Sequence, residues 1–206
     1  MEKDRLDKQL EFILAIDKEK NIFRQTYVSD ASRMENDAEH AWHMAVMCMI
    51  LSEYAEHPID KLKTMTMLLI HDLVEIYAGD TYAYAGVDAE EIHQREYAAA
   101  EKLYGMLPEE QGIYFMNLWK EFEEGKSPEA QFARTMDRIQ PMMLNAATDG
   151  RAWKEHKVRL SQIMKRNEHT AEGSSVLWDH ALKYFVMPHV ESGEIIDDET
   201  HSTGLK

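Results

Sequence analysis

The 206-residue chain has one cysteine, Cys48, so it cannot form an internal disulfide bond. A lone thiol within the apolar run 45–51 is typical of a small core residue in a reducing compartment, and we expect a cytoplasmic protein. No apolar stretch approaches the roughly 20 residues that a membrane-spanning helix requires. The highly charged residues 1–5 also lack the pattern of a secretory signal, so we expect no membrane partner.

Basic residues are scarce as well. The chain has 23 lysines and arginines against 38 acidic residues, which gives a formal net charge of −15 at pH 7. Binding of a polyanion requires a basic face, so this charge argues against nucleic acid as a partner. It does not argue against a small phosphorylated substrate, because one metal ion and one or two arginines can reverse the potential inside a cleft.

Strand patterns are also missing, since no run of alternating β-branched residues is flanked by turn signals. Methionine, alanine, leucine, glutamate and lysine are abundant, and these helix-forming residues predict an all-α chain. The length suits one domain, and neither an internal repeat nor a linker is visible. We expect this domain to cover residues 1–190 and the acidic tail, 191–206, to fray.

Periodicity and capping signals predict the positions of the helices. Asn36 and Glu39 form a capping-box pattern before an apolar helix, and Ser127 with Pro128 marks another helix start. Because apolar residues surround nearly the whole helix after Asn36, we expect that helix to be central. The predicted helices are 3–16, 37–56, 60–76, 88–104, 108–122, one from Pro128 to the turn at 149–150, 151–170 and 175–189. The polar segment 21–36 and residues 80–88 are expected to be irregular.

Histidines and carboxylates recur on these predicted helices as His40, His71-Asp72 and Asp137. A His-Asp dipeptide alone means little in a chain of this composition. However, His71-Asp72 follows the apolar run 67–70, where a charged pair is costly to bury without partners. A divalent cation would neutralise the carboxylate and use the imidazole, and two histidines with two carboxylates suit Mn²⁺, Co²⁺, Fe²⁺, Zn²⁺ or, less well, Mg²⁺. Spacing alone leaves open both a metal site and a buried, hydrogen-bonded histidine.

These residues belong to a longer ordered pattern over about residues 20–150. Its pieces are Arg24, Arg33-Met34-Glu35-Asn36, Ala38-Glu39-His40, His71-Asp72-Leu73-Val74-Glu75, Ala78-Gly79-Asp80, Glu96 and Met136-Asp137-Arg138. The pattern resembles the HD-domain metal-dependent phosphohydrolases, and within them the small single-domain 5′-deoxynucleotidases. The resemblance implies a helical bundle that binds one divalent metal between its central helices. It also implies hydrolysis of nucleoside 5′-monophosphates, most often the deoxy form, to nucleoside and phosphate, and a homodimer, as is common among relatives.

Carried over by position, the resemblance assigns a role to each matching residue. It makes His40, His71, Asp72 and Asp137 the metal ligands, Glu75 and Asp80 catalytic or substrate-facing, and Arg24 a phosphate contact. Glu75 lies three residues after Asp72 and therefore on the same helix face, where it can transfer a proton. Arg33 is a candidate for a second phosphate contact, and an ion pair with Glu35 or Glu39 is the alternative.

Two questions stay open at this level. Gln25 follows Arg24 where relatives often have tryptophan, and a bulky aromatic there could exclude a ribose 2′-hydroxyl, so sugar selectivity is undecided. The substrate class also has alternatives: a nucleoside triphosphate, guanosine tetraphosphate or a phosphodiester, or nucleotide binding without catalysis. Few basic residues lie between positions 34 and 94, which favours a monophosphate. His43 and His93 could bind a second metal, but we interpret them as packing and surface residues and predict one ion.

Overall fold

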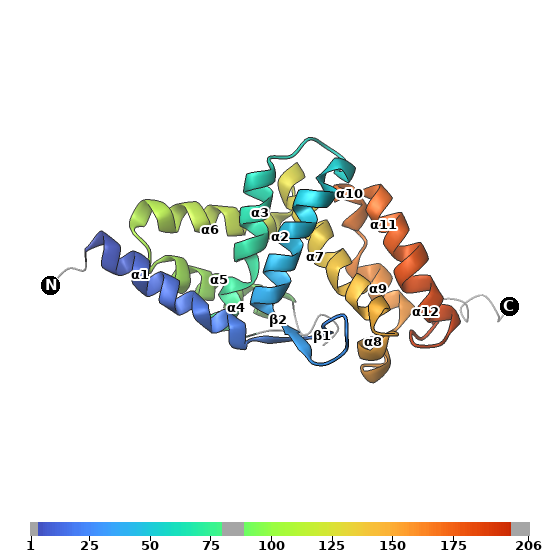
Figure 1. The fold of residues 1–206 in the computed structure, drawn as a ribbon. Helices are drawn as coiled ribbons and strands as arrows, with labels where there is room; N and C mark the ends of the chain where they lie inside the picture. The colour runs from blue at the N-terminus through green and yellow to red at the C-terminus, as the bar shows by residue number, and fades with distance from the viewer. Residues whose placement is uncertain (1–3, 80–88, 199–206) are drawn as a thin grey trace.

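The computed structural model describes residues 4–79 and 89–198, and the described chain is helical apart from one small hairpin (Figure 1). This confirms the all-α prediction. The helices are α1 Arg5–Ile16, α2 Asp37–Leu51, α3 Lys61–Ile70, α4 Glu75–Ala78, α5 Ala89–Tyr104, α6 Glu109–Glu124, α7 Pro128–Ala147, α8 Arg151–Glu155, α9 Leu160–Arg166, α10 Thr170–Gly173, α11 Ser175–Ala181 and α12 Met187–Glu191. Short 3₁₀ segments cover Asp17–Asn21, Ser52–Tyr54 and His71–Val74, and a π-helical turn covers Leu182–Val186.

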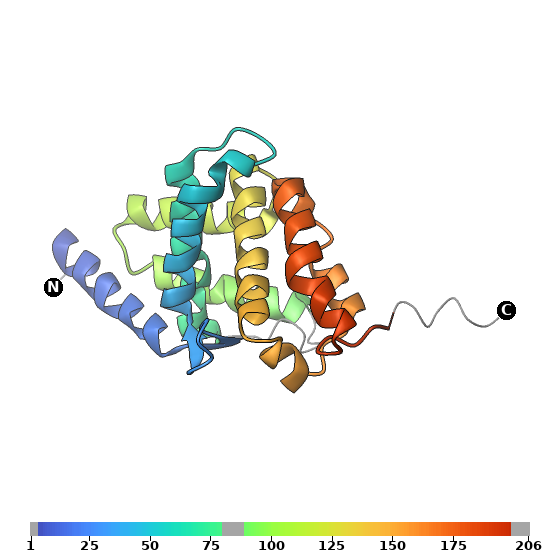
Figure 2. The ribbon, with the colours of Figure 1, turned by 45° about the vertical axis from the view of Figure 1, so that its right-hand side comes forward.

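Helices α2, α3 and α7 contact one another and form the centre of the bundle. Helices α5 and α6 pack on one side of them, and α11 lies beside α7 on the other (Figures 1 and 2). Met44, Met67, Leu68, Phe132 and Met136 are fully buried where these helices meet. Each such side chain contributes about 1.5–3 kcal/mol to folding by leaving water. None of the described helices is long and apolar enough to cross a bilayer.

Local capping fixes the starts of two helices that carry site residues. At α2, Asn36 Oδ1 accepts a hydrogen bond from the Glu39 amide at 3.0 Å, and Glu39 Oε2 accepts one from the Asn36 amide at 3.2 Å. At α7, Ser127 Oγ accepts from the Ala130 amide at 3.2 Å, with Pro128 at the first helical position. Both caps were expected, and each is worth about 1 kcal/mol.

The segment expected to be irregular, 21–36, instead contains an antiparallel hairpin. Strand β1, Phe23–Tyr27, pairs with β2, Met34–Asn36, across a bulge. The turn is closed by the Val28 amide, which donates to the Arg33 carbonyl at 3.0 Å. A strand of three residues is too short to display an alternating pattern, so the sequence carried no signal for it.

Helix α2 is central, as expected, but its apolar residues are not buried on every side. Its Met44 and Cys48 are buried, but Trp42, Met49 and Ile50 are more than half exposed on the opposite face. The helix is therefore central on one side only. Its end was also placed too late, since the α-helical part stops at Leu51 and a 3₁₀ turn follows.

The predicted helix 151–170 is divided into α8 and α9, and α10 begins only at Thr170. Lys157 has a φ of 53°, which no helix interior allows, and it separates α8 from α9. The chain after Glu191 was expected to fray, yet Ile195 is buried and Ile196 pairs with Arg159 in an isolated bridge. Ile195 is an apolar residue in an acidic segment. Its burial keeps the described part of that segment packed on the domain.

Candidate metal centre

Four side chains meet at the centre of the bundle. They are His40 from α2, His71 and Asp72 from the turn that follows α3, and Asp137 from α7. His40 Nε2 lies 3.2 Å from Asp137 Oδ1, and His71 Nε2 lies 3.1 Å from Asp72 Oδ1. The cross distances are 3.8 Å from His71 Nε2 to Asp137 Oδ1 and 3.9 Å from His40 Nε2 to Asp72 Oδ2. The structure therefore brings together all four side chains that the sequence nominated as ligands.

A change of helix type places His71 and Asp72 in this cluster. Helix α3 ends at Ile70 and continues as a 3₁₀ turn over His71–Val74 before α4 begins. The buried Ile70 carbonyl accepts a hydrogen bond from the Tyr104 hydroxyl at 2.9 Å. This bond satisfies a backbone group that would otherwise be costly to bury where the helix tightens.

Both histidines present the same nitrogen to the cluster. His71 Nδ1 donates to the Leu68 carbonyl at 3.0 Å, and His40 Nδ1 donates to Gln140 Oε1 at 2.9 Å. Because these oxygens can only accept, the Nδ1 atoms carry protons, and the Nε2 atoms point toward the carboxylates of the cluster. This arrangement of the second nitrogen is the usual one for metal-binding imidazoles.

A buried relay orients His40. The Gln140 amide nitrogen donates to Glu35 Oε1 at 2.7 Å and lies 3.2 Å from His43 Nδ1, which turns its carbonyl oxygen toward His40. Gln140 is fully buried and Glu35 nearly so. His43 thus packs beside the site, in agreement with the sequence interpretation. Sequence reasoning missed Gln140, although it lies three residues after Asp137 and hence on the same face of α7.

Each carboxylate of the cluster divides its two oxygens between a histidine and an arginine. Arg24 Nη1 donates to Asp72 Oδ2 at 2.7 Å, and Arg138 Nη1 donates to Asp137 Oδ2 at 2.6 Å. The Oδ1 atoms face the imidazoles instead. Arg24 also contacts Asp37 Oδ1 at 3.3 Å, and its side chain is only 14% exposed. The arginines therefore orient the acids and leave one oxygen of each toward the cluster centre.

The electrostatics of the cluster are those of ionised acids. Burial alone would raise the pKa of Asp72, but the charges of His71 and Arg24 hold that pKa well below its usual range. Burial opposes ionisation of Asp137 too, and Arg138 together with His40 keeps its pKa low.

Nearby glutamates differ from these two aspartates, because their pKa values are raised. Burial, with the charges of Asp72 and Asp37, raises the pKa of Glu19 to about 7.

Another glutamate with a raised pKa is Glu96 on α5. Burial and the charge of Glu123 raise the pKa of Glu96 to about 7. Burial also raises the pKa of Glu123. Burial is the main cause of all three shifts, and the charges of neighbouring carboxylates add to it.

The donor set fits a divalent metal ion. His71 Nε2 is buried and makes no hydrogen bond within residues 4–79 and 89–198, although the Asp72 and Asp137 oxygens lie 3.1 and 3.8 Å away. His40, His71 and Asp72 each offer a ligand atom, and these atoms lie within 4.8 Å of one another. Convergent nitrogen and oxygen atoms of this kind are what a metal with imidazole and carboxylate ligands needs.

The other residues that the sequence nominated for the site are Glu75, Asp80 and Arg33. Glu75 opens α4, is half-buried, and its charge acts on Arg24. Asp80 lies outside the described residues. Arg33 forms a two-pronged ion pair with Glu39, at 2.7 and 2.6 Å, on an exposed part of the surface. This is one of the two alternatives that the sequence left open, and a role of Arg33 toward substrate stays a prediction.

We expect Gln140→Leu to weaken Mn²⁺ binding about 10- to 100-fold, because His40 loses the acceptor that fixes its ring. The measurement is a Mn²⁺ titration of the folded variant by calorimetry. Gln131→Leu, on the same helix but outside the relay, serves as the matched control. An unchanged Mn²⁺ affinity in a folded Gln140→Leu protein would show that the relay does not support a metal ligand.

Comparisons with known proteins place the chain in a family. The family model described as HD domain matches residues 16–178. A human protein named 5′-deoxynucleotidase HDDC2 is 30% identical over 139 residues, which are 67% of this chain and 66% of that protein. The Dictyostelium discoideum protein of the same name is 32% identical over 143 residues, covering 66% of this chain and 75% of its own length. The chain thus spans just under two thirds of the human relative.

A solved structure covers more of the chain. It is the crystal structure of a protein described as a predicted metal-dependent phosphohydrolase from Magnetospirillum magnetotacticum. The two are 41% identical with a TM-score of 0.86, and the match covers 93% of this chain and 95% of the other. From the family match over most of its length, this chain belongs to the HD domain family.

Proposed function

We propose that this protein is a metal-dependent phosphohydrolase that cleaves nucleoside 5′-monophosphates, in particular deoxynucleotides, to nucleoside and phosphate. The observation that carries the proposal is the convergence of two Nε2 atoms and two carboxylate oxygens, with Arg24 directly beside them. The names of the relatives, 5′-deoxynucleotidase and metal-dependent phosphohydrolase, support it.

The ligand residues would be His40, His71, Asp72 and Asp137, holding one divalent ion among Co²⁺, Mn²⁺, Fe²⁺, Zn²⁺ and Mg²⁺. When bound, such an ion polarises a phosphoryl oxygen and lowers the pKa of a water molecule.

The chain's own residues complete the chemistry. Hydrolysis forms a bond from water oxygen to phosphorus and breaks the bond from phosphorus to the 5′-oxygen, which must gain a proton. Arg24 would bind the phosphate with the donors of its guanidinium group that Asp72 and Asp37 leave available. Glu75, on the same side as Arg24, would take the proton from water or deliver one to the 5′-oxygen. We propose that Asp80 shares this proton transfer.

Other HD-type substrates remain the alternative: nucleoside triphosphates, guanosine tetraphosphate or phosphodiesters, or nucleotide binding without turnover. Within the described residues, Arg24 and Arg138 are the cations that contact the ligand carboxylates. Two cations match a single phosphate group better than a polyphosphate tail. Glu75, whose charge acts on Arg24, favours catalysis over binding alone.

The test is phosphate release from deoxy- and ribonucleoside 5′-monophosphates, ATP, dGTP and a phosphodiester, each with Co²⁺, Mn²⁺, Mg²⁺ or Zn²⁺. We expect release from monophosphates, and the ratio of deoxy to ribo substrates will report what Gln25 does. Turnover of only a triphosphate or diester would contradict the monophosphate assignment. Nucleotide binding without any turnover would contradict an enzymatic role.

We also propose that the chain acts as one cytoplasmic domain, residues 1–190, and pairs as a homodimer through α1. That helix exposes an apolar stripe of Leu6, Leu10, Ile13 and Leu14, each more than half accessible. A stripe of this kind on a helix at the edge of the bundle (Figure 1) suits a second copy of the chain.

We expect Leu10→Glu combined with Leu14→Glu to convert a dimer into a monomer, because two buried charges would oppose association. The measurement is molar mass by light scattering after gel filtration. Leu62→Glu, at another exposed apolar position on α3, is the control. A monomeric wild-type protein, or a variant that remains dimeric, would count against this interface.

A further inference from the structure

A proline lies inside the helix that carries Asp137. Helix α7 runs from Pro128 to Ala147, and Pro141 falls in its interior. Proline is the least favourable residue at such a position, because it has no N–H and its ring presses on the carbonyl four residues before it. Here that carbonyl belongs to Asp137. The helix therefore gives up one backbone hydrogen bond at the residue that the cluster takes from α7.

The turn before Pro141 contacts both nitrogens of the His40 ring. Asp137 Oδ1 lies 3.2 Å from His40 Nε2, and Gln140 Oε1 accepts a hydrogen bond from His40 Nδ1 at 2.9 Å. All three side chains are buried, so none of them can shift without disturbing its neighbours. Two contacts to opposite edges of one ring leave little tolerance in the path of the turn that supplies both.

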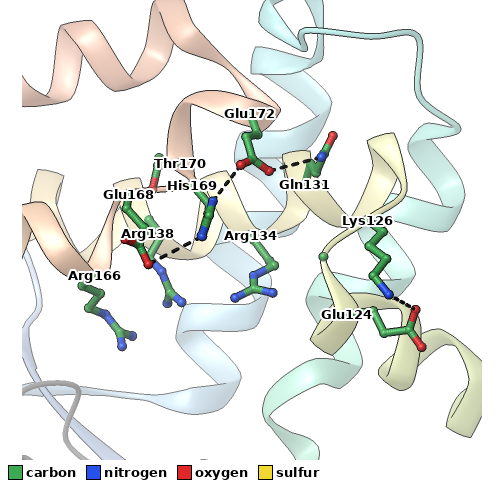
Figure 3. Close-up of a pocket in the computed structure, with 11 residues that line it drawn as sticks. Glu124, Lys126, Gln131, Arg134, Arg138, Arg166, Glu168, His169, Thr170 and Glu172 are labelled. Carbon is green, nitrogen blue, oxygen red and sulfur yellow. Dashed lines mark hydrogen bonds and ion pairs between the residues drawn. The ribbon is translucent and has the colours of Figure 1, made fainter. Parts of the chain in front are cut away.

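The same turn also governs the second oxygen of Asp137. Arg138 lines a cleft along α7 together with Arg134 (Figure 3), and it donates to Asp137 Oδ2 at 2.6 Å. A displacement of the turn would thus change three contacts at once. They are the contacts of Asp137 with His40 and with Arg138, and that of Gln140 with His40.

A second unfavourable feature follows the proline. Asn145 Nδ2 donates to the Pro141 carbonyl at 2.8 Å, one helical turn back. The Asn145 side chain is buried, and its Oδ1 makes no hydrogen bond within the described part of the chain. A buried oxygen without a partner is costly, as is a proline in a helix interior. Helix α7 therefore carries two local costs directly after the turn that contacts His40.

We propose that Pro141 is a positioning residue of the metal centre. By withholding a hydrogen bond from the Asp137 carbonyl, it sets the turn 137–140 in the path that brings Asp137 and Gln140 to opposite edges of His40. An N–H at position 141 would bond to that carbonyl and draw the turn into regular helix geometry. The inference rests on the proposed function, because it gives Pro141 a part in holding the metal ligands.

The test is Pro141→Ala, which restores the missing N–H. The variant should raise the Tm of the metal-free protein by about 5 °C, because alanine is the best residue for a helix interior. It should also weaken Mn²⁺ binding about tenfold, because two groups that hold His40 are displaced. The measurements are thermal unfolding and calorimetric titration with Mn²⁺. Pro188→Ala, in the first turn of α12 where proline needs no N–H, is the control and should leave Mn²⁺ binding unchanged.

A backbone substitution separates the missing N–H from the proline ring. Lactic acid, incorporated in place of Pro141 by nonsense suppression, has neither the N–H nor the ring. It should bind Mn²⁺ as tightly as wild type does, since the Asp137 carbonyl again receives no hydrogen bond. Weak binding by this ester variant would contradict the role that we give to the absent N–H.

A further readout needs neither metal nor substrate. In the metal-free wild type, ¹⁵N NMR of the histidine rings should show the His40 proton on Nδ1, where Gln140 accepts it, and Pro141→Ala should lose this signal. If the signal and the Mn²⁺ affinity are both unchanged in Pro141→Ala, the inference is wrong. A variant that is less stable than wild type, or fails to fold, also overturns it, because the proline then serves packing. If the expected changes appear in a protein that hydrolyses no nucleotide, the inference holds and the proposed function alone fails.

Discussion

Asp72→Ala should release the divalent metal and lower kcat/KM for a nucleoside monophosphate by about a thousandfold. Asp72 supplies the oxygen nearest to His71 Nε2, and its other oxygen holds Arg24. A metal ion contributes several kcal/mol to stabilising the charge of a phosphoryl transition state, and about 4 kcal/mol corresponds to a thousandfold in rate. The measurements are metal content by mass spectrometry and initial rates under matched metal concentration.

Thermal unfolding supplies an independent readout for the same variant. A ligand at a thousand times its Kd stabilises the folded state by about 4 kcal/mol, so Mn²⁺ should raise the Tm of wild type but not of Asp72→Ala. Asp179→Ala, which removes an exposed carboxylate on α11, is the control and should retain the metal effect. Full activity of Asp72→Ala with matched metal content would remove Asp72 from the metal centre.

Arg24→Gln should lower kcat/KM about a hundredfold while the protein keeps its metal. Arg24 is buried beside the cluster, and a charge-assisted hydrogen bond to phosphate is worth up to about 3 kcal/mol. The variant also leaves Asp72 and Asp37 without their shared cation, so we expect a lower free energy of unfolding. Kinetics, metal content and urea unfolding measured on one preparation separate the three effects.

Arg33→Gln is the informative comparison. Arg33 is exposed and its guanidinium group is paired with Glu39, so loss of that pair should change stability by less than about 1 kcal/mol. A large fall in kcat/KM for Arg33→Gln would show that Arg33 is the second phosphate contact for which it is a candidate. Unchanged kinetics in a folded Arg24→Gln protein would mean that Arg24 serves the structure of the site and not the phosphate.

The parts of the fold that the sequence predicted are those encoded locally. The capping box at Asn36 and the Ser127–Pro128 start need only neighbouring residues, and both appear as expected. The four proposed ligand residues were nominated because histidines and carboxylates in this order suit a metal site. The family resemblance supplied their partnership, and the structure shows that His40, His71, Asp72 and Asp137 do meet.

What the sequence could not predict depends on contacts between distant segments. The relay from Glu35 through Gln140 to His40 joins residues about a hundred positions apart, and no local pattern announces it. The division of each carboxylate between a histidine and an arginine has the same origin. Exposure of one face of α2 was missed because periodicity shows which residues are apolar, not which of them find partners.

The most direct test of the account is a crystal grown with Mn²⁺ and measured near the manganese absorption edge. The account predicts one anomalous peak per chain, with His40 Nε2, His71 Nε2 and oxygens of Asp72 and Asp137 at about 2.0–2.2 Å, as for similar transition-metal ligands. A peak at other residues, or none at all while the four side chains remain hydrogen-bonded to one another, would contradict the claim that this cluster is a metal centre.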